Sequence, residues 1–293
     1  MHKPNLKRGV TIRMNTKSRR TKTETAKYWV ADIFGGLDCL YGQYYTFSFA
    51  PHFHDAYALG VIEHGSNVFE YRGARRIASA GEIMLLNPAE VHTGKAADKR
   101  EGWSFRMLFV DPSLLKQVRE QITGKTSDPP FFPAAVIRDD STARRIHRLH
   151  RALEHSHSAL ESQCLFLMAL TQLLTAHANS GINVRNIGTE RLAVARTREF
   201  LLAHARENVT LDQLAQVANL SPYHLLRVFR EETGLPPHAY QTQIRIEQAK
   251  QLLRHDFTIS ETAQVTGFFD QAHFSKQFKR YVGITPGQFL IGA

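Results

Sequence analysis

Three histidines have the residue type and spacing to bind a metal ion or a polar ligand. His52 and His54 are separated by one residue in the segment PHFHDAY, and His92 follows in the segment VHTG. In a strand, alternate side chains share a face, so His52 and His54 are expected to point the same way. Three imidazoles on one face could hold a divalent metal with open positions, or could form hydrogen bonds in a pocket.

A second group of polar residues lies in an internal repeat near the end of the sequence. Residues 211–240 align with residues 259–289 when Phe269 is treated as an insertion, and both copies contain the tripeptide Ala-Gln-Val. Each copy is typical of a short helix, a tight turn and a second helix. Ser221 and Asp270 are good N-caps for the second helix of their copies. The repeat therefore predicts two helix-turn-helix units.

The second helix of each copy is expected to be amphipathic. Leu225 with Phe229, and Phe274 with Phe278, are spaced four apart and predict a core-facing side. Gly234 and Gly283 stand where a glycine commonly ends a helix. The opposite side offers residues that could reach base edges and phosphates of DNA. These are Tyr223, His224, Leu226, Arg227 and Arg230 in the first copy, and Gln271, Ala272, Ser275, Lys276 and Lys279 in the second. An ordinary helical bundle with a solvated face is the alternative, and the duplication argues against it.

The rest of the chain must supply at least one more domain, because 293 residues exceed one small core. From residue 41 to residue 110, short apolar segments separated by Gly and Pro predict an antiparallel sandwich or barrel. Residues 142–178 predict two helices, of which the second is broadly apolar. That helix must be buried, either against its own sheet domain or against a second copy of the chain. Residues 179–189 are rich in turn formers and predict a linker.

Composition limits the possible classes of protein. The sequence is 43% hydrophobic, and no apolar run is long enough to predict a membrane span. Cys39 and Cys164 form no CxxC pair, which favours a reducing compartment, and we expect a cytoplasmic protein. The net charge is +10, and much of it lies in residues 1–27, which predict a basic disordered tail.

From residue 191 to residue 289 the sequence resembles the DNA-binding domain of the AraC/XylS family of bacterial transcription regulators. The resemblance rests on LDQLAQVANLSPYHLLRVFREETGLPPHAY, RIEQAKQLL and ISETAQVTGFFDQAHFSKQFKRYVGITP, in that order. It implies seven helices, with a long central helix at about 237–253, and two recognition helices in successive major grooves. Thr262 departs from the family pattern, which usually has an aliphatic residue there, so looser packing is expected.

The segments PHFHDAYALGVIEHG and GEIMLLNPAEVHTG resemble the cupin-like sensor domain of the same family. The resemblance implies that His52, His54, Tyr57 and His92 contribute to effector binding. Metal-binding cupins usually have a Glu shortly after the second His, whereas this sequence has Ala58 and Leu59 there and Glu63 later. A role without metal is therefore favoured, and no cofactor and no metal are predicted.

Together these observations predict an α+β protein of two domains. The expected parts are a basic tail (1–27), a cupin-like, jelly-roll effector domain whose helices at 142–178 dimerise or relay (28–178), a linker (179–189), and an all-α double helix-turn-helix domain (190–293). The predicted function is regulation of transcription, not catalysis. The predicted partners are double-stranded promoter DNA, a small-molecule effector, RNA polymerase and a second copy of the chain, with no membrane. A cupin metalloenzyme with a helical partner-binding tail is the alternative.

Overall fold

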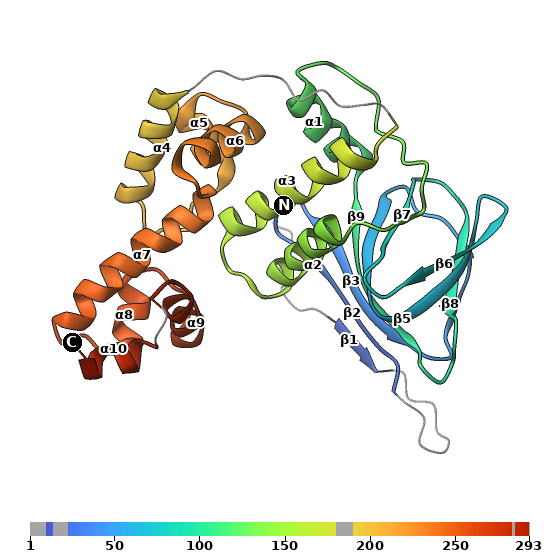
Figure 1. Ribbon diagram of the computed structural model, residues 1–293, viewed down its shortest axis with the longest axis horizontal. Helices are drawn as coiled ribbons and strands as arrows, with labels where there is room; N and C mark the ends of the chain where they lie inside the picture. Colours follow the sequence, from blue (N-terminus) through green and yellow to red (C-terminus); the bar gives the residue numbers. More distant parts are fainter. Residues whose placement is uncertain (1–9, 14–22, 180–189, 283–284, 293) are drawn as a thin grey trace, which may run out of the picture. The chain divides into compact units, whose positions relative to one another are not determined.

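The computed structural model describes residues 10–13, 23–179, 190–282 and 285–292 (Figure 1). The chain divides into two compact units. The first comprises Met1–His155 and Leu165–Arg185, and the second comprises Ser156–Cys164 and Asn186–Ala293. The predicted linker falls almost wholly on residues 180–189, outside the described residues.

The first unit is built on an antiparallel sheet, as predicted. Its strand order is β1-β2-β3-β9-β5-β7-β10, while β8 pairs with β4 and β5, and β6 pairs with β5. The strands are β1 (Val10–Arg13), β2 (Thr25–Ala31), β3 (Leu37–Tyr44), β4 (Ser48–His52), β5 (Tyr57–Tyr71), β6 (Ala74–Ser79), β7 (Ile83–Leu86), β8 (His92–Ala96), β9 (Trp103–Val110) and β10 (Val136–Ile137).

The sheet begins earlier in the chain than the sequence suggested. β1 lies within the segment predicted to be a disordered tail, and it pairs with β2 from Val10–Tyr28 to Arg13–Thr25. The Val-Thr-Ile run of β1 is β-branched, which suits an extended backbone, and the tail prediction gave this run too little weight. Residues 1–9 and 14–22 lie outside the described residues.

The long strand β5 belongs to both halves of the sheet. Its first part pairs with β9 and β7, and its second part pairs with β6 and β8. The register against β9 shifts between Ile62 and His64, and Gly65 follows with φ of 66°. A Cβ on Gly65 would lie 2.0 Å from the carbonyl oxygen of Gly102, so only glycine fits there. The chain thus bends here without breaking the strand, whereas the sequence analysis expected only short segments separated by Gly and Pro.

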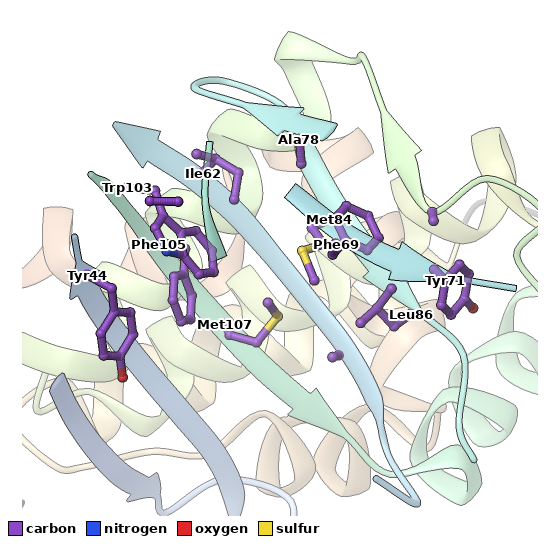
Figure 2. Packing of buried hydrophobic residues seen from close by; sticks show 13 residues of the cluster. Tyr44, Ile62, Phe69, Tyr71, Ala78, Met84, Leu86, Trp103, Phe105 and Met107 are labelled. Carbon is purple, nitrogen blue, oxygen red and sulfur yellow. The ribbon is translucent and has the colours of Figure 1, made fainter. Parts of the chain in front are cut away.

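An aromatic core lies inside the bent sheet (Figure 2). Trp103 and Phe105 stack with ring centroids 4.5 Å apart, and Tyr44 stacks on Phe105 at 6.0 Å. These residues are fully or nearly buried. Burying several large rings stabilises this end of the sheet by a few kcal/mol per ring, on the order of the transfer free energy of an aromatic side chain.

Three helices follow or interrupt the sheet: α1 (Pro112–Thr123), α2 (Asp140–His155) and α3 (Ala159–His177). The sequence predicted α2 and α3 but missed α1, although its signals are present. The Asp111 carboxylate accepts a hydrogen bond from the Ser113 N–H, Pro112 opens the helix, and Gly124 ends it with φ of 70°.

Helix α3 is the one described helix long and apolar enough to cross a membrane, and 61% of its most apolar window is buried inside the protein. Its apolar residues Phe166, Leu170 and Leu174 have no exposed surface. Phe166 contacts Phe34 with ring centroids 4.9 Å apart. The sequence analysis expected this helix to be buried either by its own sheet domain or by a second copy of the chain. Packing within one chain is enough to bury these three residues.

Helix α2 is joined to the sheet by a charged network. Arg106, which is 5% exposed, contacts Glu63 at 2.6 Å and Glu154 at 2.7 Å. The same guanidinium lies 3.1 Å from Nδ1 of His150, whose Nε2 lies 3.2 Å from the carbonyl oxygen of Met107. Since arginine only donates and a carbonyl only accepts, Nδ1 is the acceptor and Nε2 carries the proton. Burial of the imidazole is the main cause that lowers the pKa of His150 to about 4, and the positive charge of Arg106 is the next.

The second unit has no strand among its described residues and contains the seven helices α4 to α10 that the resemblance implied. They are α4 (Arg191–Ala203), α5 (Leu211–Ala218), α6 (Pro222–Thr233), α7 (Pro237–Arg254), α8 (Ile259–Val265), α9 (Gln271–Val282) and α10 (Pro286–Gly292). The central helix α7 agrees with the expected 237–253. The pairs α5–α6 and α8–α9 are the two predicted helix-turn-helix units.

The two copies share caps beyond those noted in the sequence. Thr210 and Thr258 each form a capping box, with Gln213 and Glu261 as the third-position partners. The equivalent turn residues Asn219 and Gly267 are both left-handed, with φ of 54° and 81°. The signals T-x-x-Q and T-x-x-E begin at Thr210 and Thr258. The duplication therefore begins one residue before residues 211 and 259.

Candidate functional site

The structure exposes most of the α9 residues that the sequence analysis predicted to contact DNA. Gln271, Ala272, Lys276 and Lys279 are exposed and Ser275 is half-buried, whereas Phe274 and Phe278 are completely buried. The Asp270 carboxylate accepts a hydrogen bond of 2.6 Å from the His273 N–H, which fixes the start of the helix. The helix therefore presents an amide and two ammonium groups from one face, a set suited to adenine, guanine and phosphate.

The outward face of α6 requires a correction. Tyr223 and Leu226 are each 5% exposed, so they belong to the core and not to the predicted contact face. The reason is the composition of α6, in which Leu225, Val228 and Phe229 are also buried and widen the apolar sector. A helical face inferred from one pair of apolar residues was too narrow.

The remaining predicted residues of α6 are His224, Arg227 and Arg230. Arg230 is exposed, and His224 and Arg227 are half-buried. The Arg227 guanidinium forms an ion pair of 2.9 Å with Glu231 one turn later in the same helix. The Ser221 hydroxyl accepts from the His224 N–H at 3.2 Å, as expected of an N-cap. Gly234 ends α6 with φ of 74°, whereas its partner Gly283 lies outside the described residues.

In the first unit, the structure brings the three predicted histidines together. β4 pairs with β8 so that His52 lies opposite His92, and His54 lies two residues beyond the end of β4. The ring centroids are 4.3 Å apart for His52 and His92, 4.6 Å for His54 and His92, and 5.4 Å for His52 and His54. One ring nitrogen from each residue lies within 4.8 Å of the other two. We call these residues the histidine cluster.

Backbone carbonyls fix two of these rings. Nδ1 of His52 lies 2.8 Å from the carbonyl oxygen of Ala50, and Nδ1 of His92 lies 2.9 Å from that of Glu90. A carbonyl cannot donate, so each Nδ1 carries a proton, and in the neutral form of the ring Nε2 keeps its lone pair. Burial lowers the pKa of His92 to about 4, and burial together with the neighbouring His52 lowers the pKa of His54.

The histidine cluster lines a small cavity of about 50 Å³ in the first unit. The remaining wall is largely apolar, and part of it appears in Figure 2. Trp103, Phe105, Met107 and Phe109 line it from alternate positions of β9, and Phe49 lines it from β4. The sequence analysis missed these residues, although the alternation in WSFRMLF could have found them.

Two other residues considered in the sequence lie away from the histidine cluster. Tyr57 is not among the residues that line the cavity; its hydroxyl donates to the carbonyl oxygen of Pro130 at 2.5 Å, and its ring contacts Phe132. Glu63 contacts Arg106 at 2.6 Å and His147 at 2.7 Å. The structure thus joins three of the four predicted effector residues, whereas the carboxylate of Glu63 contacts Arg106 and His147 instead.

Two family models match parts of the chain. Residues 34–170 match the model of the AraC-like ligand binding domain, and residues 214–290 match a helix-turn-helix domain. The chain is 35% identical to the uncharacterized HTH-type transcriptional regulator YbfI of Bacillus subtilis (strain 168), over 77% of this chain and 81% of that protein.

Two further similarities were found. The chain is 26% identical to the HTH-type transcriptional activator RhaS of Enterobacter sp. (strain 638), over 84% of this chain and 88% of that protein. Among solved structures, the C-terminal domain of AraT, a response regulator from Geobacillus stearothermophilus, is 30% identical over 36% of this chain and 89% of that one, with a TM-score of 0.34.

Proposed function

The chain belongs to the AraC family of transcriptional regulators, and from this premise we propose which residues carry its two activities. It is a DNA-binding regulator with an N-terminal ligand-binding domain, and its relatives are regulators and not enzymes. The proposal assigns promoter recognition to α6 and α9 and effector binding to the histidine cluster and its cavity. The observation that carries it is the duplicated helix-turn-helix, whose second copy exposes one polar face of α9 over a fully buried aromatic core.

For DNA, α9 is proposed as the stronger reader. Lys276 and Lys279 are exposed and Gln271 lies in the first turn, where recognition helices approach base edges. In α6 the proposed contacts are Arg230, Arg227 and His224. Tyr223 and Leu226 are left out of the contact set, because their side chains are buried.

For the effector, the residues that line the cavity favour a small molecule with an apolar body and one polar head, and the cavity of about 50 Å³ must widen to admit it. Aromatic and methionine side chains supply the wall, and the histidine cluster supplies polar atoms on one side. We propose a supporting role for Tyr57, whose hydrogen bond to Pro130 fixes a segment beside the sheet.

The proposal includes further partners and a location in the cell. The relative RhaS is named an activator, which favours activation and contact with RNA polymerase. A second copy of the chain is proposed as a partner, although the buried residues of α3 are not available to it. A cytoplasmic location follows from action on promoter DNA.

The test is binding of the purified full chain to a labelled fragment of its own upstream region, with scrambled DNA as competitor, over a series of salt concentrations. We expect binding that survives scrambled competitor. Lys276→Ala should weaken it at least about tenfold, on the scale of one lost base or phosphate contact. Arg196→Ala removes an exposed charge on α4, and its effect should stay within about twofold.

Two results would contradict the proposal. An equal loss of DNA affinity in Lys276→Ala and Arg196→Ala would mean that binding depends on the total positive charge and not on a contact made by α9. Binding that scrambled DNA removes, with a steep dependence on salt, would mean that only phosphates are contacted.

A further inference from the structure

The histidine cluster has the arrangement of ligand atoms that a transition metal ion requires. Three ring nitrogens lie within 4.8 Å of one another, on segments held together by the pairing of β4 and β8. Zn–N bonds of about 2.0–2.1 Å place two ligand nitrogens of a tetrahedral ion roughly 3.3 Å apart. His52 and His54 are only half-buried, so small rotations of their side chains can bring the ring nitrogens from within 4.8 Å of one another to the separation that the ion requires.

The surroundings of the rings favour metal binding over hydrogen bonding among the rings. The carbonyls of Ala50 and Glu90 hold the Nδ1 protons of His52 and His92, which leaves each Nε2 as a lone pair. Carbonyl groups in this position orient metal-binding histidines and increase their basicity. Two nitrogen lone pairs cannot form a hydrogen bond with each other, whereas a metal cation can be coordinated by the lone pairs of all the rings.

The type of donor selects the ion. The cluster contains imidazoles and no carboxylate, which disfavours Mg²⁺ and Ca²⁺ and suits Zn²⁺ and its neighbours in the first transition row. Glu63 cannot complete the set while it pairs with Arg106 and His147. Three protein ligands leave one tetrahedral position for a non-protein ligand.

We propose that His52, His54 and His92 bind one zinc-class divalent ion, and that its open position receives the head group of the effector. This departs from the sequence-based prediction of no metal, which gave most weight to the missing Glu. The ion site stands on the geometry alone, whereas the docking of an effector rests on the proposed function. The expected effector joins a metal-binding head, such as a carboxylate or a thiol, to an apolar body.

The experiment uses the full chain, stripped with a chelator and titrated with Zn²⁺ against a competing indicator dye. We expect one Zn²⁺ per chain, with at least about tenfold weaker binding in His52→Ala and in His92→Ala. His64→Ala is the matched control, because His64 is exposed on β5 and outside the cluster. Circular dichroism confirms that each variant is folded. His52 is half-buried, so its variant keeps the test usable if His92→Ala unfolds.

Substitution with Co²⁺ tests the open position, because its visible absorption reports the ligands around the ion. Added azide should shift the spectrum of the wild-type chain, and an unchanged spectrum would overturn the docking of a head group. Zn²⁺ binding that the cluster variants retain, or that His64→Ala loses equally, would overturn the site itself. Promoter binding of the same preparations is measured in parallel: its loss alongside intact Zn²⁺ binding would count against the proposed function, and not against the ion site.

Discussion

Arg227 and Lys276 differ in their electrostatic surroundings, although both are proposed to contact DNA. Arg227 is paired with Glu231 at 2.9 Å, whereas no ion-pair partner of Lys276 occurs in the described part of the chain. A DNA phosphate must compete with Glu231 for the guanidinium and is repelled by its carboxylate. The first copy is therefore expected to contribute less affinity than the second.

Glu231→Gln should consequently strengthen promoter binding by about two- to fivefold, since it removes the competing charge. Glu247→Gln is a matched control, because Glu247 pairs with Lys250 on α7 and its side chain has the same 59% exposure as that of Glu231. Dissociation constants of the three proteins at one salt concentration check this. Equal strengthening in both variants would mean that net charge alone is responsible.

Thr262 has a buried hydroxyl that lacks a hydrogen-bond partner among the described residues. Thr262→Val keeps the shape and removes the unsatisfied group, so it should raise the free energy of unfolding by about 1 kcal/mol. Thr266 provides the contrast, because its hydroxyl is equally buried but donates to the carbonyl oxygen of Thr262 at 2.6 Å. Urea unfolding should show no gain in the free energy of unfolding for Thr266→Val. A gain in both variants, or in neither, would contradict the idea that the unsatisfied hydroxyl of Thr262 destabilises the fold.

At the scale of elements, the turn between α8 and α9 depends on a glycine. Gly267 has φ of 81°, and a Cβ there would lie 2.4 Å from the carbonyl oxygen of Arg206. Gly234, at the end of α6, has φ of 74° but open space around it. The two positions share the left-handed backbone and differ in the room for a side chain.

We therefore expect Gly234→Ala to cost about 1 kcal/mol of unfolding free energy, the cost of a left-handed alanine. Gly267→Ala should cost at least about 3 kcal/mol, since backbone atoms must also move. Thermal unfolding of the two variants measures the difference. Similar costs would show that the contact with Arg206 relaxes easily.

Elements were predictable from the sequence where local signals repeat. The duplicated caps and apolar spacings gave both helix-turn-helix units, and the bounds of α7 agree closely with the expected ones. The burial of Tyr223 and Leu226 was not predictable from one helix, because it depends on which neighbours cover α6. The continuity of β5 across Gly65 was missed for a similar reason, since a glycine inside a strand marks a bend or a close approach that only the tertiary structure shows.

The candidate site was partly predictable. The spacing of His52 and His54 predicted that their side chains share one face of a strand. The resemblance added His92, but the resemblance also grouped Tyr57 with these histidines. The sequence could not show that Tyr57 contacts Pro130, 73 positions away in the chain. Nor could it show that backbone carbonyls orient the rings of His52 and His92.

At the scale of the whole molecule, the network around Arg106 predicts sensitivity of the first unit to acid. His150 has its pKa lowered to about 4 in the folded state, whereas in the unfolded chain it returns to about 6.5. Between these values the unfolded state binds the proton and the folded state does not. The stabilisation is thus complete above about pH 6.5 and is lost as the pH falls towards 4.

Urea unfolding at pH 7 and pH 5 tests this. The wild-type chain should lose roughly 1–2 kcal/mol more than His150→Gln between the two conditions, because glutamine does not titrate. The comparison uses only the change in the free energy of unfolding between pH 7 and pH 5. Any loss of stability that the substitution causes equally at both pH values therefore cancels. An equal loss in both proteins would assign the sensitivity to acid to other groups.

Strand β5 also determines how the first unit can open. Its residues from Tyr57 to Tyr71 pair with β7 and β9 along one part and with β6 and β8 along the other. Neither half of the sheet can separate without breaking hydrogen bonds to this strand. The amide protons of β5 should therefore exchange with solvent only through the largest cooperative opening of the unit, and both halves of the sheet should exchange as one foldon.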